Sequence, residues 1–596
     1  MAPEPIAASM PSTPPEPRDR YWHVLIGVAP RLLSLLDREE RSPTRGSFDR
    51  VNWAWKFRDF PLTMWQASMM PLATLYAHAH HANPYAGNAR LAHWLSIAME
   101  HTLSRQHRNG AFDSFTPYSQ DHGVTLAMVL TLATTADLLG DALSATQRER
   151  VVTGIDRACR FAEESDEDYA FINNHQAAFA LAYVRAARLT GNTGLLARAD
   201  AVMDQICEHQ SPDGWFEEYG GPDPGYETFG LTYLALANAE RPHARLDAAL
   251  TRSVDFLSHC VHPDGSIGGN YGSRNTGQYA PGGLEVLAPR VPMAAAVADF
   301  VAARLEDGNV VTPLRSDDDN LPLLTFSYSV AALHATSRLA PAPSLPCQGD
   351  HVLRRFDDSR IVVAATPRYF AVTNLAKGGA MRIFDRRTSA LAYEDAGYVV
   401  SSDGREWSTQ LLGESAVTWG PTLAEGVVVA RFAAVKRELL TPVKFLVLRI
   451  LNLTVFRSVR LGAMVRRMII ARLITGRERG AWSLRREVVF DEEQVVVHDE
   501  VVPDEAHRVT FASLERSLLP IHMGSAKYFH ANELTSVSLP SLEGWRDALS
   551  AGRPVTLSQV ISFAAGAVQH RQEHVGASAA PSLAASRARG AASRTV

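Results

Sequence analysis

The chain has 596 residues, of which 46% are apolar and 21% are charged. This much apolar surface can build a large core, so disorder over the whole length is excluded. Lys and Arg (59) nearly balance Asp and Glu (64), which leaves no global charge for binding nucleic acid or another polyanion. The four cysteines lie far apart, without metal-like spacing, which is typical of a reducing compartment.

The two ends of the chain differ in composition from the rest. Residues 1–19 are rich in Pro, Ala and Ser, and residues 570–596 consist mainly of Ala, Ser and Arg, so both are predicted to be disordered. No apolar segment of signal-peptide length occurs near the start, and no run of about 18 uncharged apolar residues occurs elsewhere. We therefore expect a cytoplasmic protein without a transmembrane helix; its oligomeric state stays open.

An internal repeat covers the first half of the chain. Polar or aromatic loops that lead into apolar helices recur at steps of 56, 56, 52 and 52 residues, counted at Pro61, Pro117, Asn173, Gly225 and Gly277. Between these loops, amphipathic helices are predicted at Ala89–Ser104, Thr146–Ala162, Thr193–His209 and Arg245–His259. Closing such helix pairs into a ring predicts an α/α toroid over residues 20–308, although a straight helical solenoid has the same period.

The character of the sequence changes after residue 308. Residues 309–348 are rich in Pro, Asp and Ser and are predicted to be a linker, with Asp317-Asp318-Asp319 as a solvated loop. Residues 349–569 contain short apolar runs of strand length, which predict an antiparallel β-sandwich. The expected fold class is therefore α+β multidomain, with an N-terminal α/α toroid of helical hairpins followed by a C-terminal antiparallel β-sandwich.

One segment, residues 440–479, interrupts the predicted strands. Lys and Arg recur through it among Leu, Ile, Val, Phe and Met at helical spacing, and Glu478 is its only acidic residue. One interpretation is a basic amphipathic helix on the inner face of an anionic membrane. The other is an insertion packed on the toroid, with its arginines paired to acidic side chains.

Polar residues cluster on the loops that open the inner helices. Asn173-Asn174-His175 opens one such helix, residues 217–226 precede the next, and Asn270–Thr276 precede the one after. A ring brings these loops to one rim, where they supply the polar groups that a sugar-binding cleft needs. Each residue also has a purely structural interpretation: Asn173 as a helix N-cap, His175 as a core histidine, Tyr226 as packing and Arg274 as an ion-pair partner.

The Asn174-His175 pair, followed about 51 residues later by Tyr226, resembles the heparinase II/III-like polysaccharide lyases. The preceding Glu217-Glu218 and the order of toroid then β-sandwich also resemble that family and its alginate-lyase relatives. Many members have His after the matching tyrosine, where this chain has Glu227. The resemblance implies a lyase that cleaves a uronic-acid glycan by β-elimination, tied to bacterial surface polysaccharide.

The resemblance also implies roles for individual residues. Asn174 is expected to bind the substrate carboxylate, His175 to act as binder or base, and Tyr226 as base and acid. Arg274 is added on chemical grounds, as a carboxylate clamp with bidentate geometry. Further residues expected to bind substrate are Tyr118, His122, Glu217, Glu218, Tyr219, Tyr271, Asn275 and Tyr279.

Two other functions stay open at this point. A glycoside hydrolase on the same scaffold would need two carboxylates across the cleft; the candidates are Asp121, Glu217, Glu218, Asp223 and Glu227. A non-catalytic glycan-binding accessory protein of polysaccharide assembly would keep the cleft without turnover. In every case the expected partner is an acidic polysaccharide or oligosaccharide; no cofactor, metal or nucleic acid is predicted.

Overall fold

The structure is a computed structural model. It describes residues 17–575 except for the short stretches 115, 166–170, 337, 339–340, 413–414, 421, 423, 436–440, 471–477, 519–525, 536–538 and 564–567. Most of the two ends predicted to be disordered lies outside the described residues. The described parts of these ends belong to the first helix and the last strand, so the predicted disorder is wrong there.

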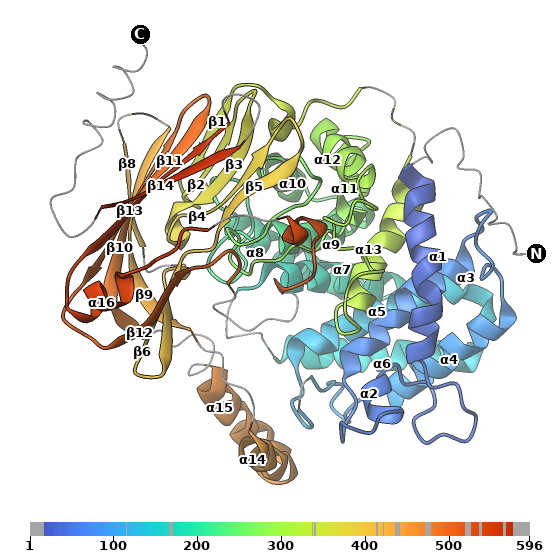
Figure 1. The fold of residues 1–596 in the computed structure, drawn as a ribbon. Helices are drawn as coiled ribbons and strands as arrows, with labels where there is room; N and C mark the ends of the chain where they lie inside the picture. The colour runs from blue at the N-terminus through green and yellow to red at the C-terminus, as the bar shows by residue number, and fades with distance from the viewer. Residues whose placement is uncertain are drawn as a thin grey trace, which may run out of the picture.

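Helices form a ring in the N-terminal half (Figure 1). The inner helices α3, α5, α7, α9, α11 and α13 contact one another in that order, and α13 returns to α3. Each inner helix also packs on an outer partner, and α13 packs on α1 from the start of the chain. The closed ring confirms the α/α toroid. The helices are α1 (Pro17–Leu35), α2 (Arg50–Trp53), α3 (Met69–Ala77), α4 (Ala89–Ser104), α5 (His122–Leu139), α6 (Ala145–Glu163), α7 (Asn173–Thr190), α8 (Gly194–Glu208), α9 (Pro224–Glu240), α10 (Ala244–Ser258), α11 (Gly282–Leu287), α12 (Pro292–Ala302) and α13 (Leu321–His334).

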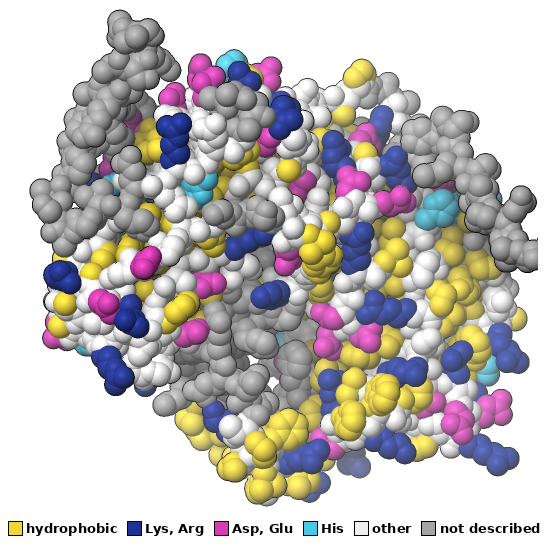
Figure 2. All heavy atoms as spheres, viewed as in Figure 1, with side chains coloured by type: hydrophobic (Ala, Val, Ile, Leu, Met, Phe, Trp, Pro, Cys, Tyr) yellow, Lys and Arg dark blue, Asp and Glu magenta, His cyan; other side chains and the backbone are white. Residues whose placement is uncertain are grey.

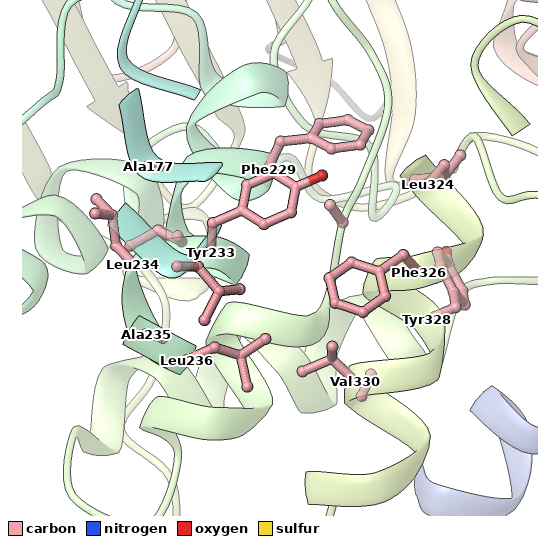
Figure 3. Close-up of a cluster of buried hydrophobic side chains, with 14 of the residues drawn as sticks. Ala177, Phe229, Tyr233, Leu234, Ala235, Leu236, Leu324, Phe326, Tyr328 and Val330 are labelled. Carbon is pink, nitrogen blue, oxygen red and sulfur yellow. The ribbon is translucent and has the colours of Figure 1, made fainter. Parts of the chain in front are cut away.

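The helical spacing of apolar residues correctly predicted the outer layer of helices. The four predicted amphipathic helices are α4, α6, α8 and α10, each within one residue of the predicted ends. Ser144 and Gln147 form a capping box that starts α6. The inner helices are apolar nearly all round, so side chains fill the ring: Tyr233 of α9 stacks on Phe326 of α13, with ring centroids 6.1 Å apart (Figure 3).

The predicted linker over residues 309–348 is wrong, because helix α13 lies within it. Its apolar side chains are buried, and it is the inner helix that closes the ring. The acidic run before it is an exposed turn, as predicted: Asp317 and Asp319 are exposed, although Asp318 pairs with Arg31 and Asp319 accepts a hydrogen bond from the indole of Trp65 at 2.8 Å. The linker was wrongly predicted because Pro and Asp flank a helix that lacks the amphipathic pattern.

The C-terminal half contains two antiparallel sheets, within the described residues. One sheet holds β1–β5 in chain order; the other has the order β12-β6-β7-β9-β10-β11-β13-β14, with β8 paired to β9. Apolar residues of the two sheets share one cluster, for example Tyr369 with Val428, which confirms the β-sandwich. The strands are β1 (Val352–Phe356), β2 (Ile361–Ala365), β3 (Tyr369–Asn374), β4 (Ala380–Asp385), β5 (Ala390–Asp395), β6 (Tyr398–Ser402), β7 (Arg405–Ser408), β8 (Ser415–Trp419), β9 (Glu425–Val435), β10 (Arg479–Phe490), β11 (Gln494–Pro503), β12 (Val509–Leu514), β13 (Val555–Ser562) and β14 (Gln569–Val575).

Three further helices belong to this half. A short helix, α16 (Trp545–Ser550), packs on β12, and two helices, α14 (Pro442–Leu453) and α15 (Val459–Ile470), stand between β9 and β10 where one basic helix was predicted. Among the described helices, the segment His122–Ala142 is long and apolar enough to cross a membrane, which the sequence had not indicated. This segment is the inner helix α5 with its following turn, and most of it is buried inside the protein.

Candidate functional site

Three loops meet at the amino ends of the inner helices α7 and α9. A β-bridge joins Ile172, just before α7, to Glu218 in the loop before α9. The hydroxyl of Ser273, in the loop between α10 and α11, donates to the carbonyl of Glu218 at 2.7 Å. These bonds hold the three polar loops that the repeat predicted at one rim.

Asp223 ties the second and third loops together. It is fully buried and is the N-cap of α9, where its side chain accepts from the backbone N–H of Tyr226 at 3.1 Å. Its other oxygen accepts from the backbone N–H of Arg274 at 2.7 Å. Burial raises the pKa of Asp223, while these N–H bonds act in the opposite direction. One carboxylate therefore fixes the backbone positions of Tyr226 and Arg274.

Arg274 carries a buried cation that is incompletely bonded. The residue is only 5% exposed, and its guanidinium carbon lies 3.2 Å from the ring centroid of Tyr219. Its Nε and Nη1 have no hydrogen-bond partner among the described residues. Buried charge without full pairing costs free energy, so a guanidinium held this way is suited to receive an anion. Tyr219 itself has a φ of +58°, a strained backbone that its loop maintains.

A second buried cation, Lys377, approaches the same loop from the β-sandwich. Its ammonium donates to the carbonyl of Gly272 and to the side chain of Asn275. Burial lowers the pKa of Lys377 to about 7, Asp223 acts to raise it, and Arg274 acts to lower it further. Two basic side chains, Arg274 and Lys377, therefore lie at this loop beside the carboxylate of Asp223.

Asn174 is held by Glu218 at the start of α7. Its backbone N–H donates to the Glu218 carboxylate at 2.7 Å, and its side-chain amide donates to both carboxylate oxygens at 3.0 Å. Burial raises the pKa of Glu218 to about 7, against the opposing effects of Asn174 and of the nearby His175. Ile172 is the N-cap of α7, so the alternative role of Asn173 as N-cap is wrong.

The two half-buried histidines of the rim share one aromatic neighbour. His175 of α7 and His122 of α5 lie 6.4 Å and 5.2 Å, between ring centroids, from Phe179. Nδ1 of His122 is 3.0 Å from the hydroxyl of Ser165. Tyr118, in the loop before α5, has a φ of +60° and its backbone N–H donates to Asp113. His122 and His175 thus both lie near Phe179, and their roles at the site stay predictions.

Several residues predicted to bind substrate make contacts inside the protein. Tyr271 and Tyr279 are fully buried, and the Tyr271 hydroxyl lies 2.9 Å from Nε2 of His262 and donates to the carbonyl of Cys260. Asn275 joins the two halves of the molecule, because its amide donates to the carbonyl of Leu518 at 2.6 Å. Glu218 is also fully buried and binds Asn174. Tyr271, Asn275 and Tyr279 lie on the loop after α10, which packs under the β-sandwich, and the roles of these four residues in binding substrate stay predictions. Glu217 and Tyr219 are half-buried at the rim.

The carboxylates considered for a hydrolase are mostly engaged as helix caps or buried acceptors. Asp121 and Asp223 are N-caps, of α5 and α9. Glu227 is fully buried and accepts from the Ser253 hydroxyl and the backbone N–H of Phe216. Burial raises the pKa of Glu227 to about 8. Four of the five candidates thus have a structural role, and Glu217 is half-buried at the rim.

Three residues near this site were not predicted from the sequence to belong to it: Asp223, Lys377 and Tyr528. Asp223 had a usable signal, since Asp before Pro is typical of a helix start, but it had been weighed only as a hydrolase acid. Lys377 lies more than a hundred residues away in the other half, where nothing local marks it. Tyr528 also comes from that half; it neighbours Tyr226, accepts from the Gln278 amide at 2.9 Å and donates to Asp317 at 2.8 Å.

A cluster that could hold a metal lies elsewhere in the described residues, at the start of α1. Asp19, His80 and His81 place one ligand atom each within 4.8 Å of one another. Nε2 of His80 is 3.0 Å from the Asp19 carboxylate, and its Nδ1 accepts from the backbone N–H of Ala82. Because both ring nitrogens of His80 already have partners, no metal is needed to explain this cluster.

Comparison with known proteins identifies the fold. The sequence matches no protein-family model and no curated protein. The structure is similar to a Paenibacillus xanthan lyase with a TM-score of 0.50 and 10% identity, over 82% of this chain and 46% of that one, so the chain spans about half its length. It also aligns with the Streptomyces coelicolor chondroitin AC lyase in complex with chondroitin sulphate, with a TM-score of 0.48 and 12% identity over 83% of this chain and 70% of that one. The alignment with heparinase III has a TM-score of 0.45 and 8% identity, over 85% of this chain and 82% of that one. The chain shares the helical-toroid and β-domain architecture of polysaccharide lyases.

Proposed function

We propose that the chain is a polysaccharide lyase that cleaves a uronic-acid-containing glycan by β-elimination. The observation that carries the proposal is the buried guanidinium of Arg274. Its Nε and Nη1 lack partners among the described residues, and its backbone is anchored on the same carboxylate as Tyr226. Elimination next to a carboxylate requires a preorganised donor for that carboxylate and a base, and Asp223 links the backbones of the two residues that would supply them.

The chemistry assigns a role to each residue. The proton on the carbon next to a uronate carboxylate is very weakly acidic, so the negative charge that develops on that carboxylate must be stabilised. Arg274 would bind the carboxylate, together with Asn174 and His175 of α7. Tyr226 would remove the proton and return it to the departing glycosidic oxygen, which breaks the C–O bond and forms a C=C bond.

The hydrolase alternative has less support. Inverting and retaining hydrolases both need two carboxylates with access to the sugar, roughly 5–10 Å apart. Asp121, Asp223 and Glu227 are used as helix caps or buried acceptors, and Glu218 is bound to Asn174. Arg274, in contrast, has unused donors, which favours a role in binding an acidic sugar.

The test follows unsaturated uronide products by their ultraviolet absorbance while the full chain is incubated with a panel of uronic-acid polysaccharides. We expect product from the wild type and a loss of at least about 100-fold in kcat for Tyr226→Phe. Tyr233→Phe is the matched control, because it removes a hydroxyl two turns further along α9 in the packed interior. New reducing ends without ultraviolet absorbance would show hydrolysis, and binding without either product would show an accessory protein; both outcomes contradict the proposal.

A further inference from the structure

The helices α14 and α15 are joined by a short turn and project together from the body of the molecule (Figure 1). Both contact the short turn of 3-10 helix at Val455–Arg457, which joins them. In α14, Asn452 is the one buried residue. We call α14, α15 and the turn between them the basic hairpin.

The basic hairpin exposes an unusual amount of apolar surface. Val443 is 70% exposed and Leu453 is 66% exposed, although both are aliphatic. Figure 2 shows hydrophobic side chains gathered with Lys and Arg in the region that α14 occupies in Figure 1. Contiguous exposed apolar patches in a folded protein mark surfaces that bind something. The large exposed apolar residues are Val443, Phe445, Leu446, Val447, Ile450, Leu453, Val459, Leu461, Met464 and Met468.

The charges of the basic hairpin have one sign. The sequence from 441 to 470 contains no Asp or Glu, while Lys444, Arg449, Arg457 and Arg460 are all exposed. In α15, Leu461, Met464 and Met468 are spaced to share one helix face. Apolar side chains mixed with cations are typical of helices that lie in the headgroup region of a membrane. Each helix has 12 residues, about 18 Å, which is too short to span a bilayer of about 30 Å.

Two exposed aromatic residues of the toroid lie beside the basic hairpin. Arg449 of α14 is 3.6 Å from the carboxylate of Asp59, in the loop after α2. In the same loop Trp55 is 63% exposed, and its ring is stacked with that of the exposed Phe57, 6.5 Å between centroids. Tryptophan is enriched where a protein meets lipid headgroups. The apolar surface thus continues from the hairpin onto the toroid.

Charge also argues against other occupants of this surface. A two-fold contact with a second copy would set the same patch against itself and bring cations close to cations. Residues 576–596 of the chain carry arginines and no acidic residue, so they do not complement the hairpin either. Anionic lipid headgroups complement the cations, and acyl chains complement the apolar side chains.

We propose that the basic hairpin, together with Trp55 and Phe57, binds the surface of an anionic lipid bilayer. The hairpin also adjoins the candidate site, since the Arg457 guanidinium carbon lies 5.7 Å from the ring centroid of Tyr118 in the loop before α5. That contact orients the rim of the toroid toward the membrane. A lyase oriented in this way would act on a glycan held close to the lipid. This consequence for the substrate rests on the proposed function.

The test is flotation of the full chain with vesicles of phosphatidylcholine alone or with one quarter phosphatidylglycerol, without any glycan. We expect flotation with the anionic vesicles, weakened by salt, and about fivefold weaker binding for each of Lys444→Gln and Arg460→Gln. Leu446→Glu combined with Leu453→Glu should abolish flotation. Leu534→Glu is the matched control, because Leu534 is 80% exposed but lies in the C-terminal half away from the hairpin.

Folding of each variant is checked by circular dichroism, which the substitutions should leave unchanged because the altered side chains are exposed. Absence of flotation by the wild type overturns the proposal, as does equal flotation of the wild type and the Leu446/Leu453 variant. A dimer in light scattering that the same variant dissociates, without vesicle binding, would assign the surface to a second copy instead. None of these results depends on lyase activity, so the two proposals fail separately.

Discussion

At the rim of the toroid the chain buries charged groups, whereas on the basic hairpin it exposes apolar ones. Arg274, Lys377 and Glu218 all lie almost entirely out of water, while Val443 and Leu453 lie mostly in it. Both arrangements cost free energy in the isolated protein, the first through lost hydration and the second through ordered water. Under the two proposals, the regions lack different ligands: an anion at the rim and a lipid surface at the hairpin.

Two buried arginines sharpen this comparison. Arg486 of β10 is fully buried, and its guanidinium is bonded to both oxygens of Asp499, at 2.7 Å and 2.8 Å, and to Asp395 at 2.8 Å. Arg274 is nearly as buried, yet two of its nitrogens have no partner among the described residues. Arg486 is therefore fully paired within the sandwich, whereas Arg274 keeps two donors without a partner among the described residues.

The largest expected effect comes from replacing these arginines with methionine, which has a similar apolar stem. Arg486→Met leaves two buried carboxylates unpaired and should lower the free energy of unfolding by about 5 kcal/mol. Arg274→Met removes an incompletely paired charge and should leave that free energy unchanged or slightly higher, while lyase activity falls about 100-fold. Urea unfolding and the ultraviolet assay measure the two quantities. Equal destabilisation by both variants would mean that Arg274 is a structural residue.

The buried acids of the rim predict a pH dependence of stability. Burial raises the pKa of Glu227 to about 8, far above 4.5, the ordinary value that it regains on unfolding. The stabilising contribution of the protonated form is thus complete below pH 4.5 and is lost as the pH rises to about 8. The free energy of unfolding should fall by about 4 kcal/mol over this range.

Glu227→Gln isolates this contribution, because it keeps an acceptor for Ser253 and the backbone N–H of Phe216. Urea unfolding at pH 5 and pH 8 should show a smaller decrease for this variant than for the wild type. Glu218, with a pKa of about 7, contributes with the same sign and remains in both proteins. Parallel pH profiles of variant and wild type would rule out a protonated Glu227.

Much of the fold could be predicted because the spacing of apolar residues along the chain reflects which face of a helix or strand is buried. The outer helices α4, α6, α8 and α10 have one polar face, and the strands β2 and β3 are short apolar runs between turns. Helix α13 escaped prediction because it is apolar on all sides, has no amphipathic signal, and is flanked by Pro and Asp. The ring closes through that helix. The repeat predicted the period of the helices, but the position of this last inner helix was established only by the structure.

The site could be predicted only as a set of loops. The repeat located Asn174, Tyr226 and Arg274 on adjacent loops, and hydrogen bonds now join those loops. It could not tell that Tyr271 and Asn275, on the same loop as Arg274, are buried, because their burial comes from the β-sandwich placed over them. Lys377 was missed for the same reason: contacts between distant segments leave no local signal in the sequence.

The smallest expected effect tests how far the membrane-binding surface extends beyond the basic hairpin. Trp55 is exposed on the toroid, so Trp55→Ser should not affect folding. If the indole enters the headgroup layer, its loss should weaken binding to anionic vesicles by roughly fivefold, about 1 kcal/mol for a partly buried large side chain. Phe511→Ser, at an exposed aromatic residue of β12, should leave binding unchanged. Identical vesicle affinities for wild type and Trp55→Ser would confine the membrane contact to α14 and α15, and the toroid would then stand clear of the lipid.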